Sequence, residues 1–352
     1  MPGPAGYRPK VATGARRDAD ALREGLGRWA ADHPQVVAAI CGEGPPPEVI
    51  AVRAAAGGLA NETLLVDLGP ARRGMAVRLP PLEETFPGYD LGPQAAVQNV
   101  VAACGLPAPA PAVAVEDPTW IGSPFLAMPL VAGDIPGPAP LFDPYVRDAG
   151  PELQRLMHDG LVDTLAAVHA VPWEERGLGA VLPGPTLRDA LARWEAYVAW
   201  SAEGDPLPAL AEALAWCGRN VPPEGSPVLL WGDVRLGNLV FDAARRVTAV
   251  LDWDLASLGP PEMDLGWHLG LEHMMGELFG DRLPGFPGLA AVCERYERLS
   301  GATVHDLDWH EVFALVRALA VNDRHQRITG DPRRRANPMG RVLLARLEQV
   351  AA

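Results

Sequence analysis

Three polar side chains that could bind a metal ion or accept a proton lie at the ends of short apolar runs. Asp233 and Asp252 each follow such a run, and Asn238 precedes one. Buried strands would hold these side chains rigidly at the edge of a cleft. A carboxylate can orient and deprotonate an attacking hydroxyl, and carboxylate and amide oxygens are ligands that suit Mg²⁺. The set therefore predicts transfer of a phosphoryl group from a nucleotide, which needs few other protein groups.

The spacing of the first two residues supports this chemistry. A catalytic aspartate followed five positions later by a metal-binding asparagine is the arrangement found in kinases, and Asp233 and Asn238 have this separation. A lone aspartate after a strand is usually a turn residue or a helix cap, but the whole combination is rare by chance. We therefore predict Asp233 as the catalytic base, and Asn238 and Asp252 as magnesium ligands.

Two further aspartates follow the same segment. Asp254 could act as a second metal ligand or shape the electrostatics of the site, and it could equally be structural. Asp264 lies at the start of a predicted helix, and we interpret it as structural support of the loop that carries Asp233.

The charge of the chain argues against anionic partners. Its 352 residues include 30 Lys and Arg against 44 Asp and Glu, a formal net charge of −14. An acidic surface repels phosphate backbones and anionic lipids, so we expect neither nucleic-acid binding nor membrane binding. The hydrophobic content of 48% is enough to bury a core. The length favours two domains, or two lobes that share a cleft.

The cysteines and the N-terminus indicate the compartment. The four cysteines are far apart and lack the spacing of a metal site, so we expect free thiols in a reducing environment. The first residues lack the apolar core of a secretory signal. No segment reaches the ~18 apolar residues that a membrane span requires. Together these features predict a soluble, cytoplasmic protein.

Residues 1–132 are predicted to form a first, nucleotide-binding lobe that opens with a helix. Apolar residues at helical spacing predict that helix over 18–32, and a second helix over 90–104 ends before Gly105. The strand-like segments of this lobe are 49–53, 63–68, 75–79, 112–115 and 124–130.

Residues 133–352 are predicted to form a larger, mainly helical lobe that contains the catalytic and metal-binding loops. Its predicted helices are 152–169, 186–202, 207–217, 261–279, 288–299, 309–329 and 337–351. The short apolar runs 227–230, 239–241 and 247–251 interrupt these helices and flank the predicted site.

The segment 229–271 resembles the aminoglycoside phosphotransferase family, which includes enzymes similar to choline kinase. The family pattern is H-G-D-x-x-x-x-N, then a strand ending in I/L-D-W/F-D/E, then D-L. Here the residues are Gly232-Asp233 with Asn238, Leu251-Asp252-Trp253-Asp254, and Asp264-Leu265. These residues are particularly similar to those of bacterial phosphotransferases and of the kinase-like domains fused to acyl-CoA dehydrogenases.

The resemblance implies an α+β, protein-kinase-like fold with two lobes: a small antiparallel-sheet N-lobe and a larger, mainly helical C-lobe. It also implies Mg²⁺ and ATP, with GTP as a possible replacement. By position, Asp233 corresponds to the base, and Asn238 and Asp252 to the metal ligands.

In the first lobe the resemblance implies a nucleotide site. Gly57, Gly58 and Asn61 stand where the family has a turn over the phosphates, although paired glycines between strands are often only a hairpin. Arg78 stands where the family has a cation that binds the phosphates. The alternative interpretation is that Arg78 is a surface arginine at a strand end. Met128 and Leu130 stand at the adenine pocket and its hinge, and Met128 is equally compatible with ordinary core packing.

The sequence departs from the family pattern at two positions. Trp231 replaces the histidine before Gly232, and it could preserve the shape of the loop. Gln94 stands where a glutamate usually pairs with the phosphate-gripping cation. An arginine at that cation does not need a partner to stay protonated. His169 also recurs in the family, and we interpret it as a buried, hydrogen-bonded histidine rather than a ligand.

We therefore predict an ATP-dependent O-phosphotransferase that phosphorylates a hydroxyl of a small molecule. A regulatory, nucleotide-binding pseudokinase is the alternative that Trp231, Gln94 and Arg78 favour. A metal-dependent hydrolase is a weaker alternative, because the histidine-rich ligand set of such sites is missing. The acceptor is open among antibiotics, sugars, amino alcohols and hydroxyacyl thioesters.

Overall fold

The computed structural model describes residues 17–44, 48–55, 62–69, 74–280 and 282–351. They divide into two compact units. Unit 1 consists of Met1–Glu84 and Pro109–Leu130, and unit 2 of Thr85–Ala108 and Val131–Ala352. The segment 85–108, which we placed in the first lobe, thus groups with unit 2.

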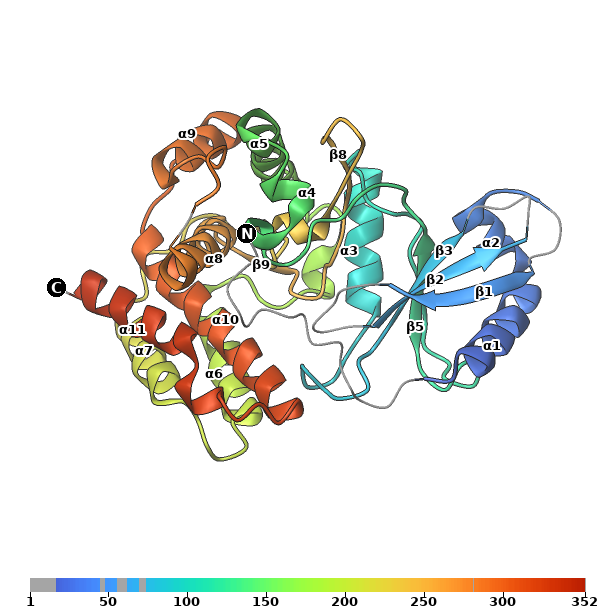
Figure 1. Cartoon of the computed structure of the whole chain (residues 1–352), viewed down its shortest axis with the longest axis horizontal. Helices are drawn as coiled ribbons and strands as arrows, with labels where there is room; N and C mark the ends of the chain where they lie inside the picture. The colour runs from blue at the N-terminus through green and yellow to red at the C-terminus, as the bar shows by residue number, and fades with distance from the viewer. Residues whose placement is uncertain (1–16, 45–47, 56–61, 70–73, 281, 352) are drawn as a thin grey trace. The chain divides into compact units, whose positions relative to one another are not determined.

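Unit 1 is built on an antiparallel sheet. Among the described residues it has five strands in the order β1-β2-β3-β5-β4, and Figure 1 shows β1, β2 and β3 side by side. Their bounds are β1 Val49–Ala54, β2 Glu62–Leu68, β3 Met75–Leu79, β4 Val113–Val115 and β5 Phe125–Pro129. Buried residues alternate along β2, as expected for a strand with one face on a core.

Two helices cover this sheet on one side. Their bounds are α1 Ala19–Asp32 and α2 Pro34–Cys41. Trp29 of α1 meets Phe125 of β5 edge to face, with ring centroids 5.2 Å apart, and both side chains are fully buried. The core of unit 1 therefore lies between these helices and the sheet.

Unit 2 is mainly helical. Its helices are α3 Gly92–Ala103, α4 Pro144–Arg147, α5 Pro151–His169, α6 Leu187–Ser201, α7 Pro208–Arg219, α8 Glu262–Phe279, α9 Leu289–Ser300, α10 Leu307–Ile328 and α11 Pro338–Ala351. The long helices α8 and α10 pack closely, since a Cβ atom on Gly266 of α8 would lie only 2.7 Å from the backbone of His310 on α10. Glycine therefore permits this approach.

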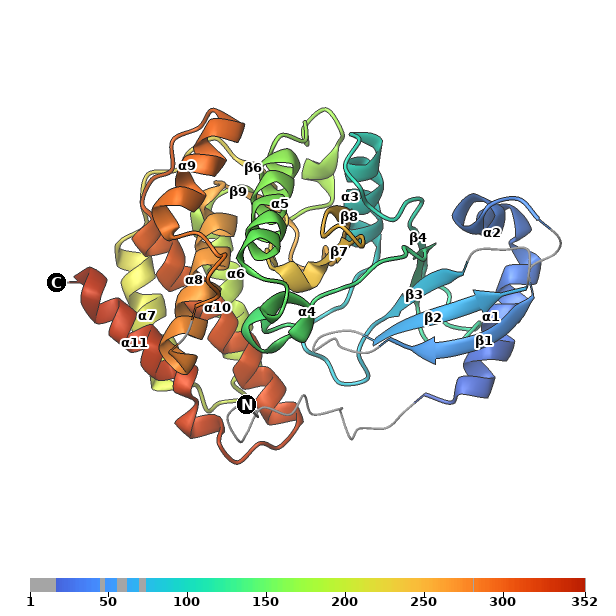
Figure 2. The ribbon, with the colours of Figure 1, turned by 45° about the horizontal axis from the view of Figure 1, so that its top comes forward.

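Four short strands of unit 2 position the predicted site. Their bounds are β6 Val228–Leu230, β7 Leu239–Phe241, β8 Val247–Val250 and β9 Ser257–Gly259. β6 pairs with β9, and β7 pairs with β8, both antiparallel. Figure 2 shows the β7–β8 hairpin beside α5, with which it shares the main core of the unit.

All four cysteines are free thiols, as expected. Among the described residues, no helix combines the length and the apolar character that crossing a bilayer requires.

Candidate active site

The β7–β8 hairpin brings the two predicted metal ligands together. Asn238 ends a 3-10 turn, Leu236–Asn238, directly before β7, and Asp252 lies just after β8. The register pairs Leu239 with Val250, and the N–H of Leu251 donates to the carbonyl of Asn238 at 2.9 Å. Residues that are fourteen positions apart in the chain are therefore neighbours at one end of this hairpin.

The carboxylate of Asp233 is held by three donors. Its Oδ2 accepts from Arg235 Nε at 2.8 Å and from Asn238 Nδ2 at 2.7 Å. Its Oδ1 accepts from the indole Nε1 of Trp267 at 3.0 Å. Asn238 Nδ2 also donates to the Asp233 carbonyl at 2.9 Å, so the amide oxygen of Asn238 points to the opposite side. The amide nitrogen thus orients the carboxylate of Asp233.

Asp264 supports the backbone of the same loop. Its Oδ2 accepts from the N–H of Trp231 at 2.7 Å, and its Oδ1 accepts from the N–H of Gly232 at 2.9 Å. The carboxylate is fully buried. His169 Nε2 contacts Oδ2 at 3.2 Å, and its Nδ1 lies 2.7 Å from the hydroxyl of Tyr296. The geometry agrees with the structural interpretation of Asp264 and with a buried, hydrogen-bonded His169.

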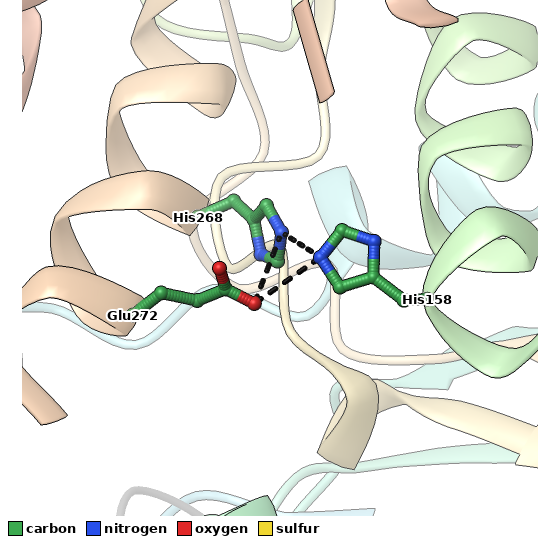
Figure 3. Close-up of side chains that lie close together, drawn as sticks. All are labelled: His158, His268 and Glu272. Atoms are coloured by element: carbon green, nitrogen blue, oxygen red, sulfur yellow. Dashed lines mark hydrogen bonds and ion pairs between the residues drawn. The ribbon is translucent and has the colours of Figure 1, made fainter. Parts of the chain in front are cut away.

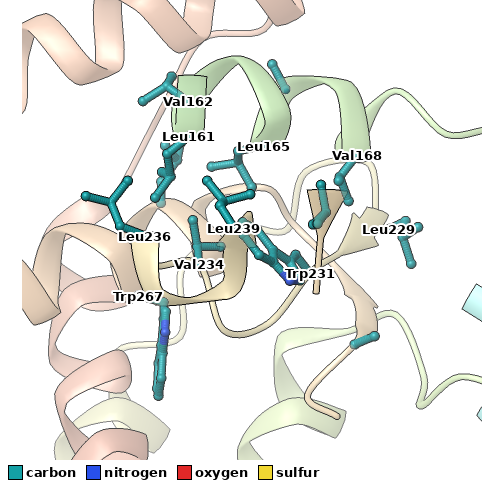
Figure 4. Packing of buried hydrophobic residues seen from close by; sticks show 14 of the residues in the cluster. Leu161, Val162, Leu165, Val168, Leu229, Trp231, Val234, Leu236, Leu239 and Trp267 are labelled. Atoms are coloured by element: carbon teal, nitrogen blue, oxygen red, sulfur yellow. The ribbon is translucent and has the colours of Figure 1, made fainter. Parts of the chain in front are cut away.

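Trp231 connects the loop of Asp233 to the turn of Asp252. Its indole Nε1 donates to the carbonyl of Leu251 at 2.9 Å and to that of Asp252 at 3.1 Å. The ring is fully buried and packs with Leu165 and Val168 of α5 (Figure 4). The tryptophan that replaces the family's histidine is therefore a hydrogen-bond donor that joins the loop of Asp233 to the turn of Asp252.

Two residues of this site have unusual backbone conformations. Asp252 has φ 65°, a left-handed conformation that aspartate tolerates better than most residues. Gly232 has φ 89°, and a Cβ atom there would lie 2.2 Å from the carbonyl oxygen of Leu255. Only glycine fits directly before Asp233.

Sequence reasoning missed Arg317 and Trp267. The guanidinium of Arg317 on α10 donates to the carbonyl of Gly232 at 3.2 Å and lies 4.6 Å from the ring centroid of Trp267. Burial lowers the pKa of Arg317 to about 10, and Asp264 and Asp233 oppose this shift, so the group stays charged at neutral pH. The sequence feature that could have identified Arg317 is its position as a single arginine inside the apolar run 312–320.

Asp254, for which two interpretations were open, pairs with a tyrosine. Its carboxylate accepts from the hydroxyl of Tyr89 at 3.2 and 3.3 Å. This contact is compatible with a structural role and leaves the role as a second metal ligand untested.

The predicted nucleotide residues lie on several elements. Arg78 is buried on β3, between Thr63 of β2 and Leu126 of β5. Met128 is buried on β5, and Leu130, directly after β5, is 36% exposed. Gly57, Gly58 and Asn61 lie outside the described residues.

Gln94 lies in unit 2, on α3, whereas Arg78 belongs to unit 1. The Gln94 side chain is buried, and among the described residues its Oε1 accepts no hydrogen bond. The pairing of Arg78 with Gln94 stays a prediction.

Comparison with known proteins shows which family the chain belongs to. A model of the phosphotransferase enzyme family matches residues 51–297. The chain belongs to this family. The match confirms the resemblance seen in the motif around Asp233, and the matched range includes β2 to β9 and the loops of the candidate site.

The relatives are similar over part of their own length. Acyl-CoA dehydrogenase family member 11 of Gallus gallus is 28% identical over 226 residues, which cover 63% of this chain and 28% of that protein. This chain therefore corresponds to less than a third of that relative.

Solved structures confirm the predicted kinase-like fold. A Ralstonia eutropha protein assigned as an aminoglycoside phosphotransferase has a TM-score of 0.68 at 23% identity, covering 93% of this chain and 98% of that one. A thermostable mutant of aminoglycoside phosphotransferase APH(4)-Ia, in a ternary complex with ADP and hygromycin B, has a TM-score of 0.56 at 16% identity, covering 87% and 96%.

Proposed function

We propose that this phosphotransferase transfers the γ-phosphoryl group of ATP to a hydroxyl of a small molecule, with Asp233 as the base. The observation that carries the proposal is the hydrogen-bonded arrangement of Asp233 and Asn238 beside the turn of Asp252. Membership of the family and the nucleotide in the structure of a family neighbour support it.

The bonds to Asp233 suggest how it would act. Among the described residues, Oδ2 accepts two hydrogen bonds and Oδ1 accepts one. Oδ1 therefore has more capacity left to accept a proton from a substrate hydroxyl. Fixed donors hold the carboxylate in one orientation, which is what a general base requires.

The donor set of the adjacent turn fits Mg²⁺. Asn238 would supply its amide oxygen and Asp252 its carboxylate, both hard oxygen ligands. When bound, Mg²⁺ neutralises charge that develops on the transferring phosphate. The guanidinium of Arg78 would hold the phosphates through its planar fork. Whether GTP can replace ATP is part of the test below.

One feature favours the pseudokinase alternative. Gln94 provides a neutral amide where the family has a carboxylate. The hydrogen bonds of the Trp231 indole, in contrast, support a loop that keeps its shape, because they connect the loop of Asp233 to the turn of Asp252.

The test is a nucleotide-consumption screen with ATP and with GTP. Acceptors should include aminoglycosides and macrolides, sugars, amino alcohols and hydroxyacyl thioesters, and phosphorylated products should be identified by mass. The proposal predicts Mg²⁺-dependent product formation with at least one acceptor class. Mg·ATP binding without product across the whole library would favour the pseudokinase, and product formation without any nucleotide would favour the hydrolase.

A further inference from the structure

Two histidines and a glutamate converge in unit 2, outside the residues assigned to phosphoryl transfer. His158 comes from α5, and His268 and Glu272 come from one face of α8, four positions apart (Figure 3). His158 Nε2 lies 3.0 Å from His268 Nε2 and 3.1 Å from Glu272 Oε1. The remaining separation, from His268 Nε2 to Glu272 Oε1, is 3.7 Å. We refer to these three residues as the histidine–glutamate cluster.

These separations suit a shared metal ion. A tetrahedral zinc ion with Zn–N bonds of about 2.0–2.1 Å keeps its ligand atoms about 3.3 Å apart. The three measured separations scatter around that value. Small side-chain adjustments would therefore be enough to place one ion between the three ligand atoms.

Hydrogen bonding alone satisfies the cluster poorly. A proton on His158 Nε2 can point to His268 or to Glu272, but not to both. A cation between the three atoms would accept one lone pair from each of them at once.

Neighbouring groups orient the cluster as they do around metal ligands. Arg282 Nη2 donates to Glu272 Oε2 at 3.3 Å, which leaves Oε1 for the cluster. The ring of Phe286 packs against His158 with centroids 5.0 Å apart. Such outer contacts fix the orientation of ligating side chains.

A cavity gives access to the cluster. It has a volume of about 150 Å³, its walls are mostly apolar, and His268 and Glu272 both line it. This volume can hold several water molecules. A water molecule from the cavity could complete the fourth coordination position, which three protein ligands leave open.

We propose that His158, His268 and Glu272 bind one divalent transition-metal ion, with Zn²⁺ as the best match. Two imidazoles and one carboxylate favour zinc over Mg²⁺, which prefers oxygen ligands alone. The ion would connect α5 to α8. It would also reach the loop of Asp233 through Trp267, which precedes His268. This site is separate from the proposed magnesium site and does not depend on phosphoryl transfer.

The test is a metal titration of the full chain, without a histidine tag and after treatment with a chelator. Zn²⁺ affinity is measured by competition with a chromophoric chelator, and Co²⁺ serves as a spectroscopic probe. We expect one equivalent of Zn²⁺ per chain, a tetrahedral Co²⁺ spectrum, and no displacement by excess Mg²⁺. Glu272→Gln and His158→Asn should each weaken Zn²⁺ binding by at least about 100-fold, more than the loss of an outer contact does.

His273→Gln is the matched control, because His273 lies on α8 next to Glu272 but does not belong to the cluster. Its Zn²⁺ affinity should equal that of the wild type. Glu272→Gln preserves the shape of the side chain, and circular dichroism verifies its folding. If both cluster variants fail to fold, thermal unfolding of the wild-type chain tests the proposal instead. Zn²⁺ should raise the midpoint of unfolding, and an unchanged midpoint would contradict the proposal. Absence of stoichiometric binding, unchanged affinity in the cluster variants, or a thiolate charge-transfer band with Co²⁺ would each overturn the proposal.

Discussion

The indole of Trp231 offers the sharpest test of how the site is held together. Trp231→Phe keeps an aromatic ring but removes the N–H that bonds the carbonyls of Leu251 and Asp252. A buried carbonyl that loses its donor costs about 1–3 kcal/mol. The smaller ring also leaves a void, which adds a cavity penalty.

Trp253→Phe is a matched control for that cavity penalty. Trp253 is 2% exposed, belongs to the same core cluster, and has its ring 6.2 Å from that of Trp231. Among the described residues its indole N–H has no hydrogen-bond partner. The substitution therefore removes the same atoms as Trp231→Phe without breaking a hydrogen bond.

The assay is urea unfolding of the wild type and of the two variants. Trp231→Phe should lower the free energy of unfolding by about 1–3 kcal/mol more than Trp253→Phe does. Values for the two variants that agree within about 0.5 kcal/mol, the usual error of such comparisons, would refute the structural role of the Trp231 hydrogen bonds.

Three further predictions concern the metal ligand, the phosphate-gripping cation and a buried histidine. Asp252→Ala should weaken Mg·ATP binding far more than metal-free ATP binding, and equal losses in calorimetric titrations would make Asp252 structural. Arg78→Ala should raise the KM for ATP clearly and the KM for the acceptor less. An unchanged KM for ATP would contradict the assignment of Arg78 to phosphate binding. Burial lowers the pKa of His310 to about 3, so the native state binds fewer protons than the unfolded state below pH 6.5. Its stabilising contribution is present above pH 6.5 and is lost as the pH falls. His310→Leu should reduce the slope of unfolding free energy against pH by up to about 1.4 kcal/mol per pH unit near pH 5, and an unchanged slope would contradict this.

Elements with a strong sequence pattern could be predicted. The strand β3 has the predicted bounds, and the predicted helices from α5 to α11 agree closely with the observed ones. The proximity of the loop residues Asp233, Asn238 and Asp252 could be predicted from their spacing, whereas their chemical roles stay predictions. Their observed proximity depends on the register of β7 and β8, which a short hairpin fixes locally.

Among the elements that were missed, α2 and β9 were missed for local reasons. A single residue separates the end of α1 from Pro34, where α2 begins. The apolar sequence of α2 is too short to show a helical periodicity of its own. β9 has three residues and exists because it pairs with β6 across an intervening segment. Neither carries a signal that sequence periodicity could separate from its surroundings.

The long-range contacts of the site could not be predicted. Trp267 Nε1 reaches Asp233 because α8 returns along the loop, and Arg317 reaches Gly232 from α10. The histidine–glutamate cluster likewise joins α5 to α8 over 110 positions. Such partners depend on how helices pack, and no spacing rule within one segment reveals them.

The central claim is that Asp233 acts as the base of phosphoryl transfer. The most direct measurement compares kcat and the Kd for Mg·ATP in the wild type, in Asp233→Asn and in Asp242→Asn, a control in the β7–β8 turn. The account predicts that kcat of Asp233→Asn falls by about 10²–10⁴-fold while its Kd for Mg·ATP stays within a few-fold of the wild type, and that Asp242→Asn keeps its activity. If Asp233→Asn retains more than about a tenth of the wild-type kcat, far above the range for a lost base, Asp233 is not the base and the account is contradicted.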